Sequence, residues 1–205
     1  MLHYQRYFRS LIVFFVVTLG IGHAAAETPN NSAKAFISQI ATQLQQALQS
    51  GRDLNRLGDN EYLDQIIDQY ILPHIDQEYL SRRIFHPRWK DIIAADKTAE
   101  AQMAVIKSLR RTYRIALNTY NGQMIEVGKS RDKPSYSVVR LKVHTTQNAH
   151  TLDFAIRETD GQWQVFDLSV DGVVLSKTLN GAIHRTLESG DVDAVIAAIN
   201  PPDES

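Results

Sequence analysis

The stretch VRLKVHTTQNAHTLDFAIRETDGQWQVFDLSV, residues 139–170, contains the pattern that decides the fold of this chain. Apolar and polar residues alternate over 139–144 and again over 152–157, and this period of two is typical of strands with one buried face. The segment 147–149 provides a turn between them, and Asp160-Gly161 is a strong signal for a two-residue hairpin. We therefore predict a series of antiparallel strands joined by short turns.

The strand that follows this hairpin changes phase. In a regular strand Trp163 and Val165 would point to one face, whereas Phe166, Leu168 and Val170 would point to the other. Either a bulge interrupts the strand or both of its faces are covered.

Helical spacing dominates the chain before the strands. Apolar residues recur at helical intervals from Ala33 to Tyr120, and only a short strand is expected over 123–127. The longest helix is expected over about 98–120, where its apolar side chains fill an arc of roughly 160°. This arc is wider than a helix lying on a flat surface needs, so we expect this helix to contact two other layers. Two closing helices are expected over 174–188 and 191–200.

Three shorter helices are expected before the longest one. The first ends near Gly51, the second begins near Asp59 and is broken by Pro73, and Asp76 caps the third. Helices followed by an antiparallel meander describe an α+β fold, in which helices cover one face of the sheet. A curved sheet closed by a broad apolar helix leaves a cone-shaped interior that suits a ligand.

Composition excludes several classes of protein. The chain has 205 residues, 22 Lys and Arg against 23 Asp and Glu, a formal net charge of -1 and no cysteine. The balance of charge argues against a general nucleic-acid binder, which usually has a basic excess. The absence of cysteine excludes disulfides, thiolate metal sites, a thiol nucleophile and a lipid-modified N-terminal cysteine.

The first 26 residues have the pattern of a secretory signal. Arg6 and Arg9 precede an apolar run over 11–22, and Ala24-Ala25-Ala26 follows it. The run has roughly 12 residues, whereas a membrane-spanning helix needs about 20. We therefore predict a signal peptide over 1–26 that is cleaved after Ala26, and a single domain over 27–205. An exported protein without disulfides suits a bacterial periplasm.

Few motifs indicate catalysis. The sequence has no phosphate-binding glycine loop, no nucleophile-elbow serine and no histidine pair at metal spacing. His144 and His150 flank a hairpin turn. We interpret them as solvent-exposed turn residues, and the alternative is that they face each other and bind a metal ion. Asp167 lies between Phe166 and Leu168, so it is either a base with a raised pKa, a carboxylate that the bulge turns outward, or the partner of an arginine.

A basic flank lies beside the apolar arc of the longest helix and consists of Lys107, Arg110, Arg111 and Arg114. Three interpretations stay open. The flank is a solvated face, a rim that meets a lipid phosphate, or a docking surface for an acidic partner.

Three stretches resemble the MlaC family of periplasmic phospholipid-binding proteins, also known as toluene-tolerance auxiliary transport proteins. They are Ile-Leu-Pro-His-Ile-Asp over 71–76 with Trp89 further on, Leu-Arg-Arg-Thr-Tyr-Arg-Ile-Ala-Leu over 109–117 with Tyr120, and Gly-Gln-Trp-Gln-Val-Phe-Asp-Leu-Ser-Val-Asp-Gly-Val over 161–173. The family's serine after the last stretch is replaced here by Val174.

The resemblance implies a fold similar to nuclear transport factor two with extra helices, and an apolar pocket that holds acyl chains between the sheet and the helices. It implies a carrier that shuttles phospholipid between an outer-membrane complex of the MlaA lipoprotein type and an inner-membrane ABC transporter of the Mla type, and so maintains outer-membrane lipid asymmetry. It implies no enzymatic step, no cofactor besides the phospholipid cargo, and no nucleic-acid partner.

The apolar faces of the expected elements supply the candidate pocket residues. They are Ile67, Ile71, Leu80, Ile84, Val105, Leu109, Tyr113, Val139, Leu141, Phe154, Ile156, Phe166 and Val170. Three rival functions remain at this point: an isomerase or hydrolase that uses Asp167 as base, a carrier of another lipid such as a hopanoid, and a structural adaptor with a filled core.

Overall fold

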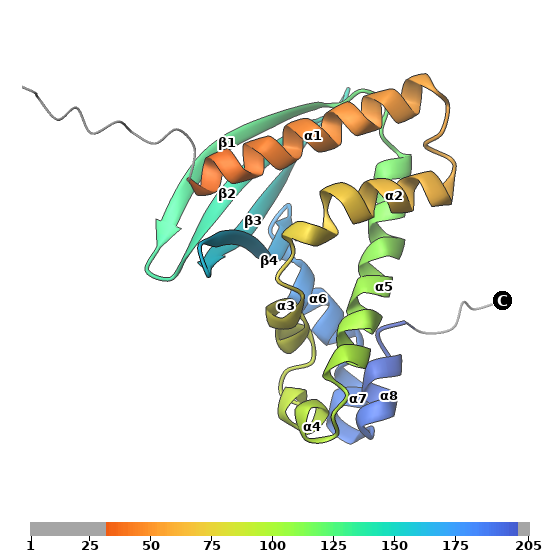
Figure 1. Ribbon diagram of the computed structural model, residues 1–205, viewed down its shortest axis with the longest axis vertical. Coiled ribbons are helices and arrows are strands. Elements are labelled where there is room, and N and C mark those ends of the chain that lie inside the picture. The colour runs from red at the N-terminus through yellow and green to blue at the C-terminus, as the bar shows by residue number, and fades with distance from the viewer. Residues whose placement is uncertain (1–31, 201–205) are drawn as a thin grey trace, which may run out of the picture.

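The computed structural model describes residues 32–200 of the chain (Figure 1). The expected signal peptide therefore lies outside the described residues. The helices are α1 (Ala33–Asp53), α2 (Asn60–Tyr70), the 3-10 turn η1 (Leu72–His74), α3 (Gln77–Ile84), α4 (Trp89–Ala94), α5 (Thr98–Asn118), α6 (Leu175–Ala182), α7 (His184–Ser189) and α8 (Val192–Ala197). The strands are β1 (Met124–Lys133), β2 (Tyr136–His144), β3 (Ala149–Thr159), β4 (Gln162–Val170) and β5 (Val173–Val174).

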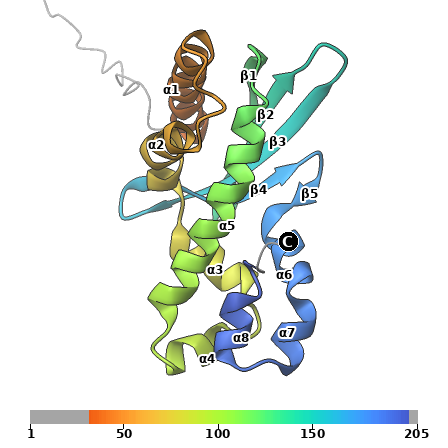
Figure 2. The same cartoon turned by 90° about the vertical axis from the view of Figure 1, so that its right-hand side faces the viewer.

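The strands form one antiparallel sheet in the order β1-β2-β3-β4-β5. Val139 lies opposite Phe154 and Leu141 opposite Leu152, so the alternating residues of β2 and β3 share one face. Asp160 and Gly161 both have positive φ, 52° and 75°, as a two-residue hairpin turn of this kind requires. The α+β class with helices on a curved antiparallel sheet is confirmed (Figures 1 and 2).

The phase change in β4 comes from a bulge. Ala155 lies opposite Asp167, whereas the next residue, Ile156, lies opposite Val165. Phe166 is therefore an extra residue on β4, which restores the alternation on either side of it.

Strand β1 is longer than the 123–127 segment that the sequence predicts. It continues to Lys133 and pairs with β2 across a turn at residues 134–135. Its register shifts between Val127 and Ser130, and its last three residues are exposed. A strand whose end has no buried face shows no alternation of apolar residues, which explains why the sequence pattern did not reveal it.

Side-chain caps define the starts of four helices among the described residues, and Asp191 caps α8. Ser32, Asp59 and Asp76 accept hydrogen bonds from the first-turn amides of α1, α2 and α3, respectively. The expected closing helix over 174–188 is interrupted at Ile183 and forms α6 and α7. Gly181, near the end of α6, lowers helix propensity at this break.

Two apolar cores exist instead of one. In the sheet core, α1 packs on the sheet through Ile37 and Ala41 against Val139, Leu141 and Ile156. The helical core is formed by α2 to α8 together with the end of α1 at Leu48. Its fully buried members include Leu63, Ile67, Ile84, Phe85, Ile92, Val105, Leu109 and Val195. Both views show α1 lying along the sheet. Helices α4, α7 and α8 gather instead around the N-terminal end of α5 (Figures 1 and 2).

The segment around η1 connects the two cores. The amide of Asp76 donates to the carbonyl of Val165 over 2.8 Å, and Ile75 forms an isolated bridge with the same residue. The Asp76 carboxylate also accepts from Nε and Nη2 of Arg157 on β3, at 2.9 and 2.6 Å. None of the helices between residues 32 and 200 has the length and apolar character to cross a membrane.

Stability depends on the helical core. Ile84 is 0% exposed, whereas Ile93 on the neighbouring α4 is 55% exposed. We expect Ile84→Ala to lower the free energy of unfolding by about 2–5 kcal/mol, because it leaves a cavity. The matched variant Ile93→Ala should change it by less than about 0.5 kcal/mol. Urea unfolding followed by circular dichroism measures both values, and equal losses in the two variants would contradict this description of the core.

Candidate functional site

Both cores leave apolar side chains half-buried, and these side chains define the candidate site. On the sheet core, Phe36, Ile125, Val127, Val143, Leu152 and Phe154 retain partial exposure. On the helical core, Leu44, Tyr70, Ile71 and Tyr113 do the same. Apolar surface that stays in contact with water is unfavourable at about 25 cal/mol per Å². An apolar ligand between the cores would remove this cost.

The candidate pocket residues separate into two groups in the structure. Ile67, Leu80, Ile84, Val105 and Leu109 are buried in the helical core, with Ile71 and Tyr113 half-buried at its surface. Val139, Leu141 and Ile156 are buried in the sheet core, with half-buried Phe154 packed against it.

The remaining two candidates lie elsewhere. Phe166 belongs to neither core and packs edge-on against Tyr79 and Tyr136, with ring centroids 5.2 and 5.6 Å apart. Its position on the bulge turns it away from the regular pattern of β4. Val170 is 43% exposed at the end of β4, so the structure places it at the surface.

Tyr113 lies deep in the molecule on α5. Burial, with a smaller contribution from the charge of Asp167, raises the pKa of its hydroxyl to about 12. The side chain nevertheless retains partial exposure to solvent.

Asp167 forms an ion pair with an arginine, one of the three arrangements that the sequence left open. It is 5% exposed, and its Oδ2 accepts from Nε of Arg83 over 3.0 Å and from Oγ of Ser176 over 2.6 Å. Its Oδ1 accepts from the backbone amides of Leu168 and Ser176. Both carboxylate oxygens are thus occupied by donors of the chain itself, which disfavours a role as general base. Arg83 and Ser176 are distant in the sequence, and no local pattern identifies them as its partners.

The basic flank of α5 is only partly free. Nε of Arg114 donates to Asp64 over 2.6 Å, and Nη1 of Arg110 donates to Asp68 over 3.0 Å, so both arginines bind α2. The Arg114 guanidinium lowers the pKa of Asp64, chiefly through this hydrogen bond. Among residues 32–200 no ion pair is found for Lys107 or for Arg111.

An open groove of about 600 Å³ runs between η1 and α5 and includes part of this flank. Its walls combine apolar Leu72 and Ile106 with the exposed Met103, while Lys107 and Arg110 supply the charges. Two residues of the basic flank, Lys107 and Arg110, therefore border an apolar surface.

His144 and His150 do not face each other. His150 lies opposite Val143 in the β2–β3 register, and adjacent residues of a strand point to opposite faces, so the two histidines lie on different faces. His144 contacts Glu126 and His150 contacts Asp171, at 3.0 and 2.8 Å. Within the described part of the chain no group of three or more His, Asp or Glu side chains has the arrangement of a metal site.

Comparison with known proteins identifies relatives of this chain. A family model described as MlaC protein matches residues 38–201. The solved structure of the phospholipid-binding protein from Ralstonia solanacearum, determined in complex with a phospholipid, aligns with a TM-score of 0.74. The two sequences are 22% identical, and the match covers 82% of this chain and 95% of that chain. At this identity the likeness shows that the two proteins share a fold.

His74 of η1 makes the stability of the site sensitive to pH. Its ring packs edge-on against Phe36 of α1 at 5.5 Å, and burial lowers its pKa below 6.5. The unfolded chain therefore takes up a proton at a higher pH than the folded protein. This contribution to stability is complete above about pH 6.5 and decreases as the pH falls toward the folded pKa.

We expect His74→Gln to reduce the loss of stability between pH 7.5 and 5.5. Urea unfolding at a series of pH values measures the slope of stability against pH. Equal slopes for the variant and the wild-type protein would contradict this role of His74.

Proposed function

The chain belongs to the MlaC protein family, as its three resembling stretches predicted, and on this premise we propose that it is a carrier that binds a phospholipid. The observation that carries the proposal is the pair of half-buried apolar surfaces on the sheet core and the helical core. The acyl chains lie between these surfaces. The Ralstonia solanacearum relative shares the fold and was solved in complex with a phospholipid, which supports a phospholipid as the cargo.

The energetics of exchange support this arrangement. Two acyl chains of about 16 carbons gain on the order of 25 kcal/mol on leaving water, at about 0.8 kcal/mol per CH₂. A bilayer offers the same gain, so a carrier has to provide a comparably apolar environment for exchange to be near thermoneutral. Two cores with uncovered apolar margins provide it without requiring the protein to unfold.

The candidate pocket residues have different roles in this proposal. Half-buried Ile71, Tyr113 and Phe154 contact the acyl chains directly. The buried candidates support the half-buried side chains of the two cores. They are Ile67, Leu80, Ile84, Val105, Leu109, Val139, Leu141 and Ile156. Phe166 and Val170 lie at the margin of the sheet.

The carrier operates in the periplasm in this proposal. Cleavage after Ala26 releases the domain over 27–205, which exchanges lipid with an outer-membrane complex of the MlaA lipoprotein type and an inner-membrane ABC transporter of the Mla type. The groove beside α5 supports such docking, because exposed Met103 and the cations Lys107 and Arg110 offer both apolar and basic contacts. This exchange maintains the lipid asymmetry of the outer membrane.

Purification without detergent tests the cargo. We expect protein exported to the periplasm of a bacterial host to contain near-stoichiometric diacyl phospholipid in native mass spectrometry. A polycyclic lipid such as a hopanoid in its place would identify the rival carrier. A lipid-free mass together with no uptake from vesicles would contradict both and favour the adaptor.

Charged substitutions test the position of the acyl chains. We expect Leu141→Asp or Phe154→Asp to abolish lipid retention, because a carboxylate in an apolar environment costs several kcal/mol. The matched variant Val173→Asp, at a position that is 62% exposed, should retain lipid. Circular dichroism establishes which variants are folded, and normal retention by folded variants of both Leu141 and Phe154 would contradict this placement.

A further inference from the structure

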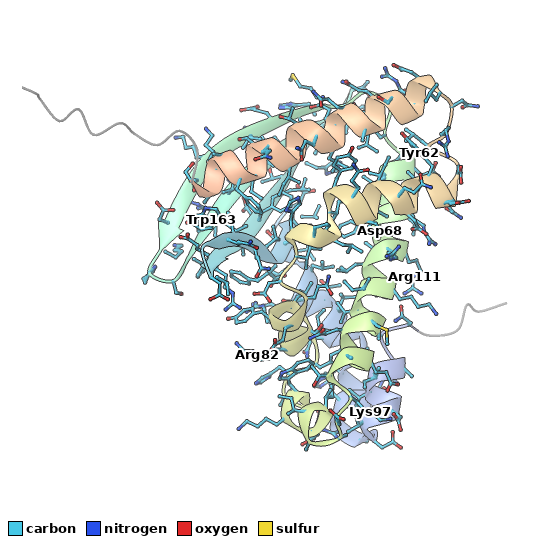
Figure 3. The ribbon with its side chains drawn as sticks, viewed as in Figure 1. Tyr62, Asp68, Arg82, Lys97, Arg111 and Trp163 are labelled. Carbon is cyan, nitrogen blue, oxygen red and sulfur yellow. The ribbon has the colours of Figure 1, made fainter. Side chains whose placement is uncertain are left out.

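A second groove lies between α3 and α6, on a different part of the surface from the basic flank of α5. It has a volume of about 350 Å³ and its walls include Tyr79, Arg82, Arg83, His86, Ser176 and Lys177. Helices α3 and α6 lie next to each other and both contact β4. Figure 3 shows Arg82 projecting from α3 on the side away from α5.

The groove has an excess of positive charge. None of the residues that line it is acidic. Arg83 is neutralised by Asp167, which lies buried behind the groove. Arg82 and Lys177 form no ion pair among the described residues, and Glu78, one helical turn before Arg82, is not bonded to it. Two cations therefore remain uncompensated, with His86 beside them.

The cationic groups are held in place before any ligand binds. The Arg82 guanidinium stacks over the Tyr79 ring at 4.5 Å, and that ring packs against Phe166 of the β4 bulge. Arg83 is fixed through Nε and Nη2, both 3.0 Å from the Asp167 carboxylate. A guanidinium has five N–H donors, so each arginine retains donors for a ligand. Fixed donors lose less conformational entropy when they bind an anion.

We propose that the groove between α3 and α6 binds a phosphate group. Guanidinium groups bind phosphate oxygens in pairs through parallel N–H donors, and a lysine adds a further charged donor. The cations line a hollow, which suits a compact tetrahedral anion better than the extended acidic surface of a protein. Phosphate esters and inorganic phosphate share this chemistry.

Two sources can supply the phosphate. One is the headgroup of the phospholipid, and this source rests on the proposed carrier function. Phe166 and Asp167 of β4 contact Tyr79 and Arg83 of the groove, so a headgroup at the groove stays close to the bulge of β4. The other source is free phosphate in solution.

Titration with inorganic phosphate tests the site independently of lipid. We expect phosphate to cause saturable changes in the amide NMR signals of α3 and α6, relative to sodium chloride at equal ionic strength. The double variant Arg82→Gln/Lys177→Gln should weaken this binding about tenfold or more, because it removes both uncompensated cations of the groove. The matched variant Lys129→Gln/Arg185→Gln removes equal charge from exposed positions outside the groove and should bind as the wild type does.

A lipid comparison identifies the source. The wild-type protein and the groove variant are loaded from vesicles that contain either phosphatidylglycerol or diacylglycerol in a neutral matrix. If the groove variant loads less phosphatidylglycerol than the wild type but the same amount of diacylglycerol, the groove binds the headgroup. If the variant loads both lipids as the wild type does, while the wild type binds inorganic phosphate in the titration, the groove binds free phosphate. Failure to load either lipid would contradict the carrier function and leave the titration result standing.

The proposal is overturned if phosphate causes no saturable change at α3 and α6. It is also overturned if the groove variant binds phosphate as tightly as the matched variant does. Binding of an acidic peptide at the groove without phosphate binding would assign it to a protein partner and reject the phosphate site.

Discussion

The ion pair between Asp167 and Arg83 is the interaction on which the arrangement of helices around the sheet depends. Asp167 is nearly inaccessible to water, and its two oxygens bind α3 through Arg83 and α6 through Ser176. Charges are expensive to bury without a partner, so the bulge, α3 and α6 have to be positioned together. The same interaction neutralises the arginine at the back of the α3–α6 groove and leaves the outer cations without counter-charges.

The apolar side chains of the described residues are divided between two cores that polar contacts connect. A chain of this length has enough apolar residues for one continuous core. The sheet core and the helical core are instead joined at η1, where the Asp76 amide bonds to β4 and its carboxylate binds Arg157. Polar contacts of this kind fix the sheet core and the helical core relative to each other. In the proposed carrier, the acyl chains lie between the half-buried apolar side chains of these two cores.

Local patterns predicted most of the fold from the sequence. The alternation in β2 and β3, the Asp160-Gly161 hairpin and the Asp76 cap each depend on neighbouring residues, and each is present. The phase change near Phe166 gave two alternatives, and only the register with β3 identified the bulge. The candidate site was harder to predict from the sequence. Asp167 binds Arg83, which is 84 positions away in the chain, and Arg114 binds Asp64, which is 50 positions away. Spacing along the chain contains no information on such pairs.

The exposed end of β1 has a consequence for the association of one copy of the protein with another. Edge strands offer unpaired backbone groups to other chains and promote aggregation. Here β1 is an edge strand, and its outer half is exposed and bears Lys129, Arg131, Asp132 and Lys133. These charges oppose strand-to-strand pairing between molecules. The charged end of β1 thus removes one route by which copies of this protein could associate.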